Sequence, residues 1–411
     1  MKEIEVELFP RCSSRTMPGL RCFSQHGHPE LRTEQAMLRR TKIVIAAYCF
    51  GAIAFLVLVV SLVLQFTDWW GRPERYGESA HQHHHEEDTG PEATPAETYA
   101  VGDRTYLKVP ATDQDFDVTD SSVDLRQILH VNLDLEKFPD LKELRFVSAD
   151  EKPDILPDED AVLGVSIEGE EKAYPIRMLN YHVILNDLCA GNEIAVVWDF
   201  LTLTPKVFRR RLEGNDTSKP VLTFGKVALL YKGCLLLYDE PTRSLWWPPD
   251  GTCLAGKLSG TVLREYPFLL ASWEVWKRRH PKTAVLSTDT PFSQKYQNSY
   301  EYQRYYATPR LPVPVEEWDA RKSPFKWSEP VIVLKAETTA KAYPLSVIAR
   351  ANGIIEDTFA GRKVVIQDPE FRPPYPTDDH GQEIPYAFGA WFLWSVRYPD
   401  IEIYSPEGDT K

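Results

Sequence analysis

Residues 162–199 read VLGVSIEGEEKAYPIRMLNYHVILNDLCAGNEIAVVWD, and residues 331–368 read VIVLKAETTAKAYPLSVIARANGIIEDTFAGRKVVIQD. Both stretches hold an apolar strand-like run, a polar turn, K-A-Y-P, a short apolar segment, N-D or E-D, A-G, and a second apolar run that ends in Asp. A solenoid needs three or more such units, so two copies predict two related lobes packed into one domain.

The K-A-Y-P motif has a structural interpretation in each copy. Proline fixes φ and favours the start of a short helix, here after Pro175 and after Pro344. A tyrosine just before it can pack its ring while its hydroxyl seeks a hydrogen-bond partner. The acidic residue that follows at matching places is Asp187 in the first copy and Asp357 in the second.

Short apolar runs broken by turn residues dominate the chain after residue 100, which is typical of strands. The one clear helix candidate is Phe268–Arg279, where Trp273 and Trp276 are three residues apart. The predicted class is therefore α+β, rich in antiparallel β-structure. The predicted strands are 162–167, 194–198, 221–224 and 235–238.

Residues 43–66 form an apolar run that contains no charged residue. As a helix the run would extend about 36 Å, enough to cross a hydrocarbon core of about 30 Å. More Lys and Arg residues precede it than follow it, which favours a cytoplasmic N-terminus, and the two tryptophans that follow it are typical of a membrane interface. The sequence thus predicts one transmembrane helix, a cytoplasmic segment 1–42, and an extracytoplasmic domain over 101–411.

Residues 67–100 connect this helix to the domain and are predicted to be a disordered linker, because they lack apolar periodicity. The linker carries a histidine tract whose imidazoles could bind a transition metal, although a solvated low-complexity segment is the alternative. The candidate metal ligands in this tract are His83, His84 and His85.

The chain is acidic, with a formal net charge of -13, and has no sustained basic patch, so nucleic acid is not an expected partner. Three of the six cysteines lie in the main domain, at 189, 234 and 253. No C-x-x-C spacing occurs, which excludes a dense disulfide framework. Buried free thiols are the default expectation, and a single bridge between Cys234 and Cys253 is the alternative.

Three segments together resemble a bacterial family of unknown function, the domain family numbered 3179. They are VLGVSIEGEEKAYPIRMLNYHVILND, LTFGKVALLYKGCLLLYDEPTRSLWWP and ASWEVWKRRHPKTAVLSTDT. The resemblance implies a Cys-Pro-x-Cys-Gly run where this chain has DFLTL, so Asp199 and Thr202 replace the two cysteines. Thiol redox chemistry or soft-metal binding is not expected of this chain in that form.

His182, Asp187 and Asp199 are the candidate catalytic residues. If a hairpin turns at Ala190-Gly191, His182 and Asp199 fall at the same end of it. A histidine beside a carboxylate could act as a general base or supply part of a metal site. The alternative is structural: His182 caps a helix or bonds the backbone, and Asp199 ends a strand.

Four aromatic residues suggest a stacking platform for a sugar, or else core packing. They are Tyr231, Tyr238, Trp246 and Trp247. The favoured function is a membrane-anchored extracytoplasmic binding or scaffolding module, because the residues that give the resembling family its chemistry are replaced. The alternatives are a metal-dependent or hydrolytic enzyme and a carbohydrate-binding domain. The sequence assigns no cofactor.

Overall fold

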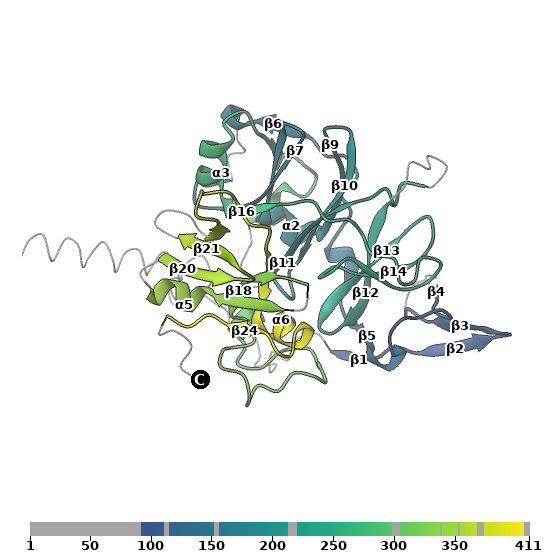
Figure 1. The fold of residues 1–411 in the computed structure, drawn as a ribbon. Helices are drawn as coiled ribbons and strands as arrows, with labels where there is room; N and C mark the ends of the chain where they lie inside the picture. The colour runs from purple at the N-terminus through teal and green to yellow at the C-terminus, as the bar shows by residue number, and fades with distance from the viewer. Residues whose placement is uncertain are drawn as a thin grey trace, which may run out of the picture. The chain divides into compact units, whose positions relative to one another are not determined.

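The fold consists of several β-sheets and a few short helices, which confirms the predicted β-rich class (Figure 1). Among the described residues no helix is long and apolar enough to cross a membrane. The predicted anchor at 43–66 and the tract His83–His85 lie outside the described residues. The computed structural model describes residues 92–110, 115–151, 156–212, 220–297, 305–337, 339–351, 354–367 and 374–406.

The first lobe is a five-stranded sheet in the order β16-β7-β8-β17-β6, with two helices and a hairpin. Strand β7 pairs antiparallel with β16 and β8, whereas β8 pairs parallel with β17. The hairpin turns at Ala190 and Gly191, whose φ values of 48° and 73° suit a type I′ turn, as predicted. The elements are β6 (Phe146–Ser148), β7 (Ala161–Ile167), β8 (Glu170–Pro175), α2 (Ile176–His182), β9 (Ile184–Cys189), β10 (Asn192–Asp199), β16 (Leu269–Ser272), α3 (Trp273–Arg279) and β17 (Ala284–Leu286).

The second lobe repeats this topology in a four-stranded sheet ordered β23-β18-β19-β24. Strand β18 again pairs antiparallel with both neighbours, and β19 pairs parallel with β24. The likeness extends beyond the two predicted stretches, because α6 repeats the Trp-x-x-Trp of α3 at Trp391 and Trp394. The elements are β18 (Pro330–Lys335), β19 (Ala340–Pro344), α5 (Leu345–Arg350), β20 (Ile354–Phe359), β21 (Arg362–Gln367), β22 (Tyr375–Thr377), β23 (Ala387–Ala390), α6 (Trp391–Arg397) and β24 (Glu402–Ile403).

Strand β11 (Thr204–Arg209) joins the β9–β10 hairpin, as β22 joins β20 and β21 in the second lobe. The next four strands have no counterpart among the described residues of the second lobe and enter a six-stranded sheet, called here the inserted sheet. Its order is β1-β5-β12-β13-β14-β15. The strands are β1 (Ala93–Pro95), β5 (Ile128–Val131), β12 (Phe224–Tyr231), β13 (Cys234–Asp239), β14 (Leu245–Trp247) and β15 (Thr252–Ala255).

The N-terminal part of the described chain is more ordered than predicted. Strand β1 and the first three residues of β2 lie within the segment 67–100 that is expected to be a disordered linker, so that expectation is wrong for these residues. They form because their backbones pair with β5 and β3, which composition alone does not reveal. The remaining elements are β2 (Thr98–Val101), β3 (Arg104–Leu107), β4 (Phe116–Asp117), and the 3₁₀ helices η1 (Leu125–Gln127), η2 (Leu135–Lys137), η3 (Ala149–Glu151) and η4 (Ser293–Gln297).

Two predicted elements are displaced. The helix expected at Phe268–Arg279 begins only at Trp273, because Ser272 caps it by accepting a hydrogen bond from the backbone N–H of Val275. Residues 269–272 are instead strand β16, paired with β7. The strand expected at 221–224 begins at Phe224, whose backbone N–H and C=O both bond the Asn186 side chain.

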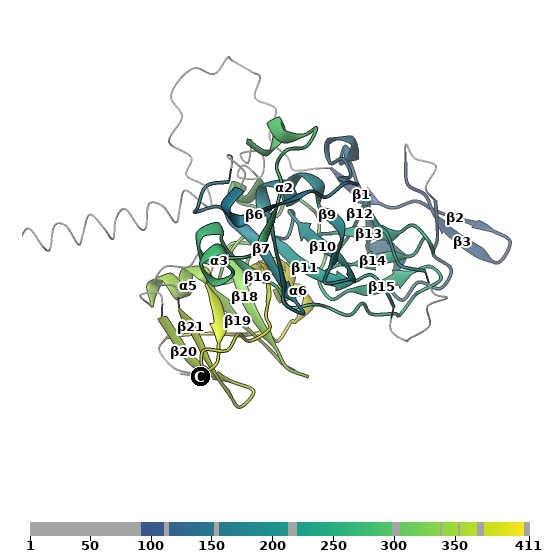
Figure 2. The same cartoon turned by 90° about the horizontal axis from the view of Figure 1, so that it is seen from above.

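The two lobes contact each other beside the start of β11. The backbone N–H of Ala390 donates to the carbonyl of Thr202 over 2.7 Å, and the N–H of Leu270 donates to the hydroxyl of Tyr386 over 3.1 Å. Strand β11, which extends the hairpin of the first lobe, also contacts β23 of the second lobe, and Figure 2 shows the elements of the two lobes next to each other. The described residues therefore form one packed unit in which the lobes share an interface.

Candidate functional site

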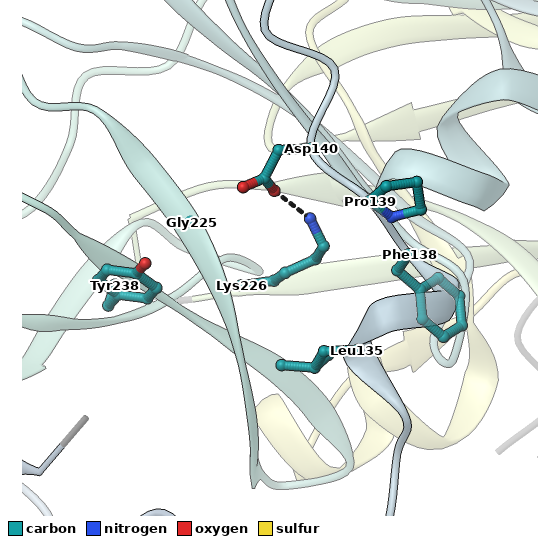
Figure 3. Close-up of a pocket in the computed structure, with 7 residues that line it drawn as sticks. All are labelled: Leu135, Phe138, Pro139, Asp140, Gly225, Lys226 and Tyr238. Carbon is teal, nitrogen blue, oxygen red and sulfur yellow. Dashed lines mark hydrogen bonds and ion pairs between the residues drawn. The ribbon is translucent and has the colours of Figure 1, made fainter. Parts of the chain in front are cut away.

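A pocket of about 210 Å³ opens between η2 and the β12–β13 hairpin (Figure 3). Figure 3 shows Lys226 in the middle of it, with Tyr238 on one side and Phe138 and Pro139 on the other. Charged and aromatic groups thus meet in one small space. The lining residues are Leu135, Phe138, Pro139, Asp140, Gly225, Lys226 and Tyr238.

Local strand geometry brings Lys226 and Tyr238 to this pocket. Gly225 faces Tyr238 directly in the β12–β13 register, and a Cβ at position 225 would come within 2.7 Å of the Tyr238 ring. The register then shifts between Lys226 and Leu230, which is a bulge, and bulges commonly redirect side chains at functional sites. Glycine and bulge together shape the wall on which the lysine lies.

Lys226 forms an ion pair with Asp140, and the two side chains differ in exposure. The Lys226 side chain is 5% exposed and the Asp140 side chain is 61% exposed. A buried ammonium group needs a partner because removal from water disfavours the charge. The Asp140 carboxylate, by contrast, is largely exposed to water. The ion pair therefore matters mainly to Lys226, whose buried ammonium group has little access to water.

His182 lies behind the pocket wall, fully buried at 0% exposure. Its Nδ1 lies 2.8 Å from the carbonyl oxygen of Pro139, which can only accept, so Nδ1 carries the proton. In the neutral ring Nε2 then accepts from the Tyr296 hydroxyl at 2.8 Å, and that oxygen accepts from Thr290 at 2.6 Å. Burial lowers the pKa of His182, which favours this neutral form.

Asp199 ends β10 as predicted and is 1% exposed. One carboxylate oxygen accepts from the backbone N–H of Leu201 at 3.1 Å, and the other accepts from the Thr202 hydroxyl at 2.7 Å and the N–H of Leu235 at 3.3 Å. Desolvation by burial raises its pKa. Asp199 therefore organises the loop that follows β10.

Asp187 lies near the opposite end of the hairpin. It accepts hydrogen bonds from Lys172 at 3.0 Å and from the Tyr174 hydroxyl at 2.7 Å. These partners come from K-A-Y-P, so the structural interpretation of that motif is confirmed.

The three candidate catalytic residues thus have separate partners. The hairpin brings His182 and Asp199 to the same end, as predicted, because the backbone N–H of Trp198 donates to the carbonyl of Val183. Their side chains then bond different groups. Asp187 is paired with Ile194, which lies five residues from Asp199 along β10, so Asp187 is far from the other two candidates on the hairpin. Within the described part of the chain, no group of three or more His, Cys, Asp and Glu side chains is arranged to hold a metal ion.

The four aromatic candidates do not form an exposed platform. Tyr231, Trp246 and Trp247 are 7%, 1% and 4% exposed, so they are core residues. Tyr238 is half-buried and lines the pocket. Of the two interpretations that the sequence left open, core packing is therefore confirmed for Tyr231, Trp246 and Trp247, and the sugar platform is wrong, because these strands of the inserted sheet are covered on both faces. The cysteines at 189, 234 and 253 are free and buried, as expected by default.

The sequence pattern did not point to Lys226 or Asp140. A lysine inside the apolar run Phe224–Tyr231 was the available signal, since a charge in a buried strand needs a specific partner. The partner is 86 residues away in the chain, so its identity follows only from the fold.

Residues 135–401 match the model of a family described as "Protein of unknown function (DUF3179)". No curated protein and no solved structure matches the chain. The matched region covers well over half of the 411 residues and includes every residue that lines the pocket. The chain therefore belongs to the DUF3179 family.

Proposed function

We propose that this protein is a membrane-anchored, extracytoplasmic binding module that holds a small ligand in the pocket beside Lys226. The observation that carries the proposal is a nearly buried amino group placed in an open pocket of about 210 Å³. Ligand sites use a few fixed polar groups to orient a ligand in a concave space, and here one ion pair lies beside Leu135 and Phe138 in such a space.

The division of the fold supports the same proposal. The two lobes of matching topology, which we interpret as copies of one ancestral unit, would form the scaffold. Gly225, Lys226 and Tyr238 come from the inserted sheet, which has no counterpart in the described part of the second lobe. A segment added to a repeated scaffold is a natural place for function, because the scaffold keeps its packing without it.

Membrane anchoring rests on the apolar run at 43–66 and on the basic residues before it. In this proposal the run tethers the domain on the outer face, with residues 1–42 in the cytoplasm. Protease treatment of intact cells should then digest the domain, and full protection of the domain would contradict this orientation.

Ligand-observed NMR on the full-length chain in detergent tests the pocket. Benzoate, benzylamine and benzamide serve as probes because they share a ring and differ in charge. We expect at least one probe to bind saturably, and Gly225→Val to weaken that binding at least about tenfold, since the added side chain collides with Tyr238.

Lys277→Met is the matched control, because Lys277 pairs with Asp150 on the first lobe and does not line the pocket. Lys226→Met, which keeps the length of the side chain and removes its charge, is the second pocket variant. It should also weaken binding, and it tests the pocket if Gly225→Val does not fold. Absence of saturable binding by all three probes, or unchanged binding in both pocket variants, would contradict the proposed function.

A further inference from the structure

We propose that the ligand is a small monocarboxylate whose carboxylate takes the place of Asp140 on Lys226. This inference rests on the proposed function and names the chemical class of ligand for the same pocket. Asp140 is then an internal carboxylate that occupies the site until the ligand arrives.

The difference in exposure between the two partners carries the argument. Lys226 cannot leave its carboxylate for water, because its side chain is only 5% exposed and belongs to a strand in the middle of a sheet. The Asp140 side chain, at 61% exposed, is already mostly hydrated. An incoming carboxylate can therefore satisfy the lysine while Asp140 turns outward into solvent.

The backbone around Asp140 allows this exchange without unfolding. Residues 139–142 follow η2 and belong to no helix or strand, so rotation of the Asp140 side chain breaks no ladder hydrogen bond. The preceding carbonyl of Pro139 is held by buried His182. The wall of the pocket thus stays fixed while only the carboxylate moves.

The walls define the rest of the ligand. Leu135, Phe138 and Tyr238 bound the space beside the ion pair, and buried Phe138 is fixed by stacking on Phe200 with ring centroids 5.1 Å apart. The volume of about 210 Å³ is below the roughly 300–1,000 Å³ of pockets for drug-sized ligands, which indicates a small molecule.

A phosphate or sulfate fits less well. Lys226 is the only cation among the seven residues that line the pocket, and Asp140 is the only anion. A dianion would meet one positive charge in a chain whose formal net charge is -13. A single carboxylate would place one negative charge beside Lys226, as Asp140 does now. A monocarboxylate is therefore the class of ligand that the site favours.

Removal of the internal carboxylate is the test. In full-length Asp140→Ala we expect benzoate to bind about tenfold more tightly than in the unmodified protein, because it no longer competes with Asp140. Benzoate should also raise the melting temperature of Asp140→Ala more than that of the unmodified protein. Asp150→Ala, which removes an exposed carboxylate from Lys277, is the matched control and should change neither value.

Asp140→Asn, which keeps the shape of the side chain, serves if the alanine variant does not fold. Tighter binding of benzamide, benzylamine or inorganic phosphate than of benzoate would overturn the inference and leave a binding pocket in place. Equal benzoate affinity in the unmodified protein and both Asp140 variants would also overturn it. Binding of no probe to any variant would overturn the proposed function as well.

Discussion

His182 is the last residue of α2, a position at which many residue types can end a helix. Its two ring nitrogens are used in opposite ways, one as donor to Pro139 and one as acceptor from Tyr296. Few side chains offer a donor and an acceptor at opposite ends of a rigid ring. We interpret His182 as a positioning residue for the pocket wall.

His182 predicts a specific pH dependence of stability. Its folded-state pKa lies below the unfolded value of about 6.5, so its contribution is complete above that pH and is lost as pH falls through the folded pKa. We expect His182→Gln to flatten the decline in the free energy of unfolding between pH 7 and 5. Urea unfolding of the unmodified protein and of His182→Gln at several pH values measures this free energy.

His130 and His280 also have a lowered pKa. They are present in the unmodified protein and in His182→Gln alike, so their effect on stability cancels when the two are compared. Parallel pH profiles for the two proteins would show that the buried imidazole does not titrate as proposed.

Asp199 and Leu203 bound the loop where the family resemblance implies a Cys-Pro-x-Cys-Gly run. Leu203 has a φ of 57°, a conformation that glycine adopts without strain, so the loop keeps the backbone expected of the glycine. The Asp199 carboxylate closes the loop through the Thr202 hydroxyl, at the two positions implied to be cysteines. The hydroxyl–carboxylate hydrogen bond therefore stands where the resemblance implies a pair of thiols.

At the scale of elements, both lobes link a strand to the following hairpin in the same way. A lysine and a tyrosine on β8 or β19 bond an aspartate on β9 or β20. Tyr343 donates to Asp357 at 2.9 Å, and Lys341 pairs with the same carboxylate at 2.8 Å. The corresponding distances to Asp187 in the first lobe are 2.7 Å and 3.0 Å. The motif therefore explains why K-A-Y-P and the later aspartate occur together.

Equal geometry predicts equal energetic cost. Tyr174→Phe and Tyr343→Phe should each lower the free energy of unfolding by about 2 kcal/mol, because each removes a hydrogen bond to a charged carboxylate. Tyr266→Phe, which removes a bond to the neutral side chain of Asn192, is the control and should cost about 1 kcal/mol. Chemical denaturation gives these values, and losses no larger than the control would count against the interpretation.

At the scale of the whole molecule, the two lobes meet where there is no room for a side chain. A Cβ at Gly389 would lie 2.7 Å from Trp394 Nε1 and 2.8 Å from Thr204 Oγ1. Trp394 belongs to the second lobe, whereas Thr204 begins the strand that extends the hairpin of the first. The close approach couples the lobes, so we expect them to unfold together.

Gly389→Ala should therefore destabilise the protein by about 1–3 kcal/mol through overpacking. Circular dichroism and tryptophan fluorescence during denaturation should still report one coincident transition at lower denaturant. Gly260→Ala is the control for backbone strain without overpacking, because Gly260 has a φ of 81° and no atom within 4 Å of the added Cβ, and it should cost less. Two separate transitions in the unmodified protein would contradict the coupling of the lobes.

The sequence by itself determined the features that depend on neighbours along the chain. Turn residues at Ala190-Gly191 and the apolar run at 162–167 predicted strands and a hairpin that the structure contains. The repeated pattern predicted two stretches that fold alike. These succeed because backbone preference and side-chain alternation are local properties.

Tertiary structure alone decided the site. Whether an aromatic such as Trp246 is core or platform depends on what covers its strand, and the partner of Lys226 comes from 86 residues away. A buried charge must find a counter-charge, but the sequence does not say which, because that choice is made when the inserted sheet packs against η2. The repeated lobes could therefore be predicted, whereas the pocket beside them required the folded chain.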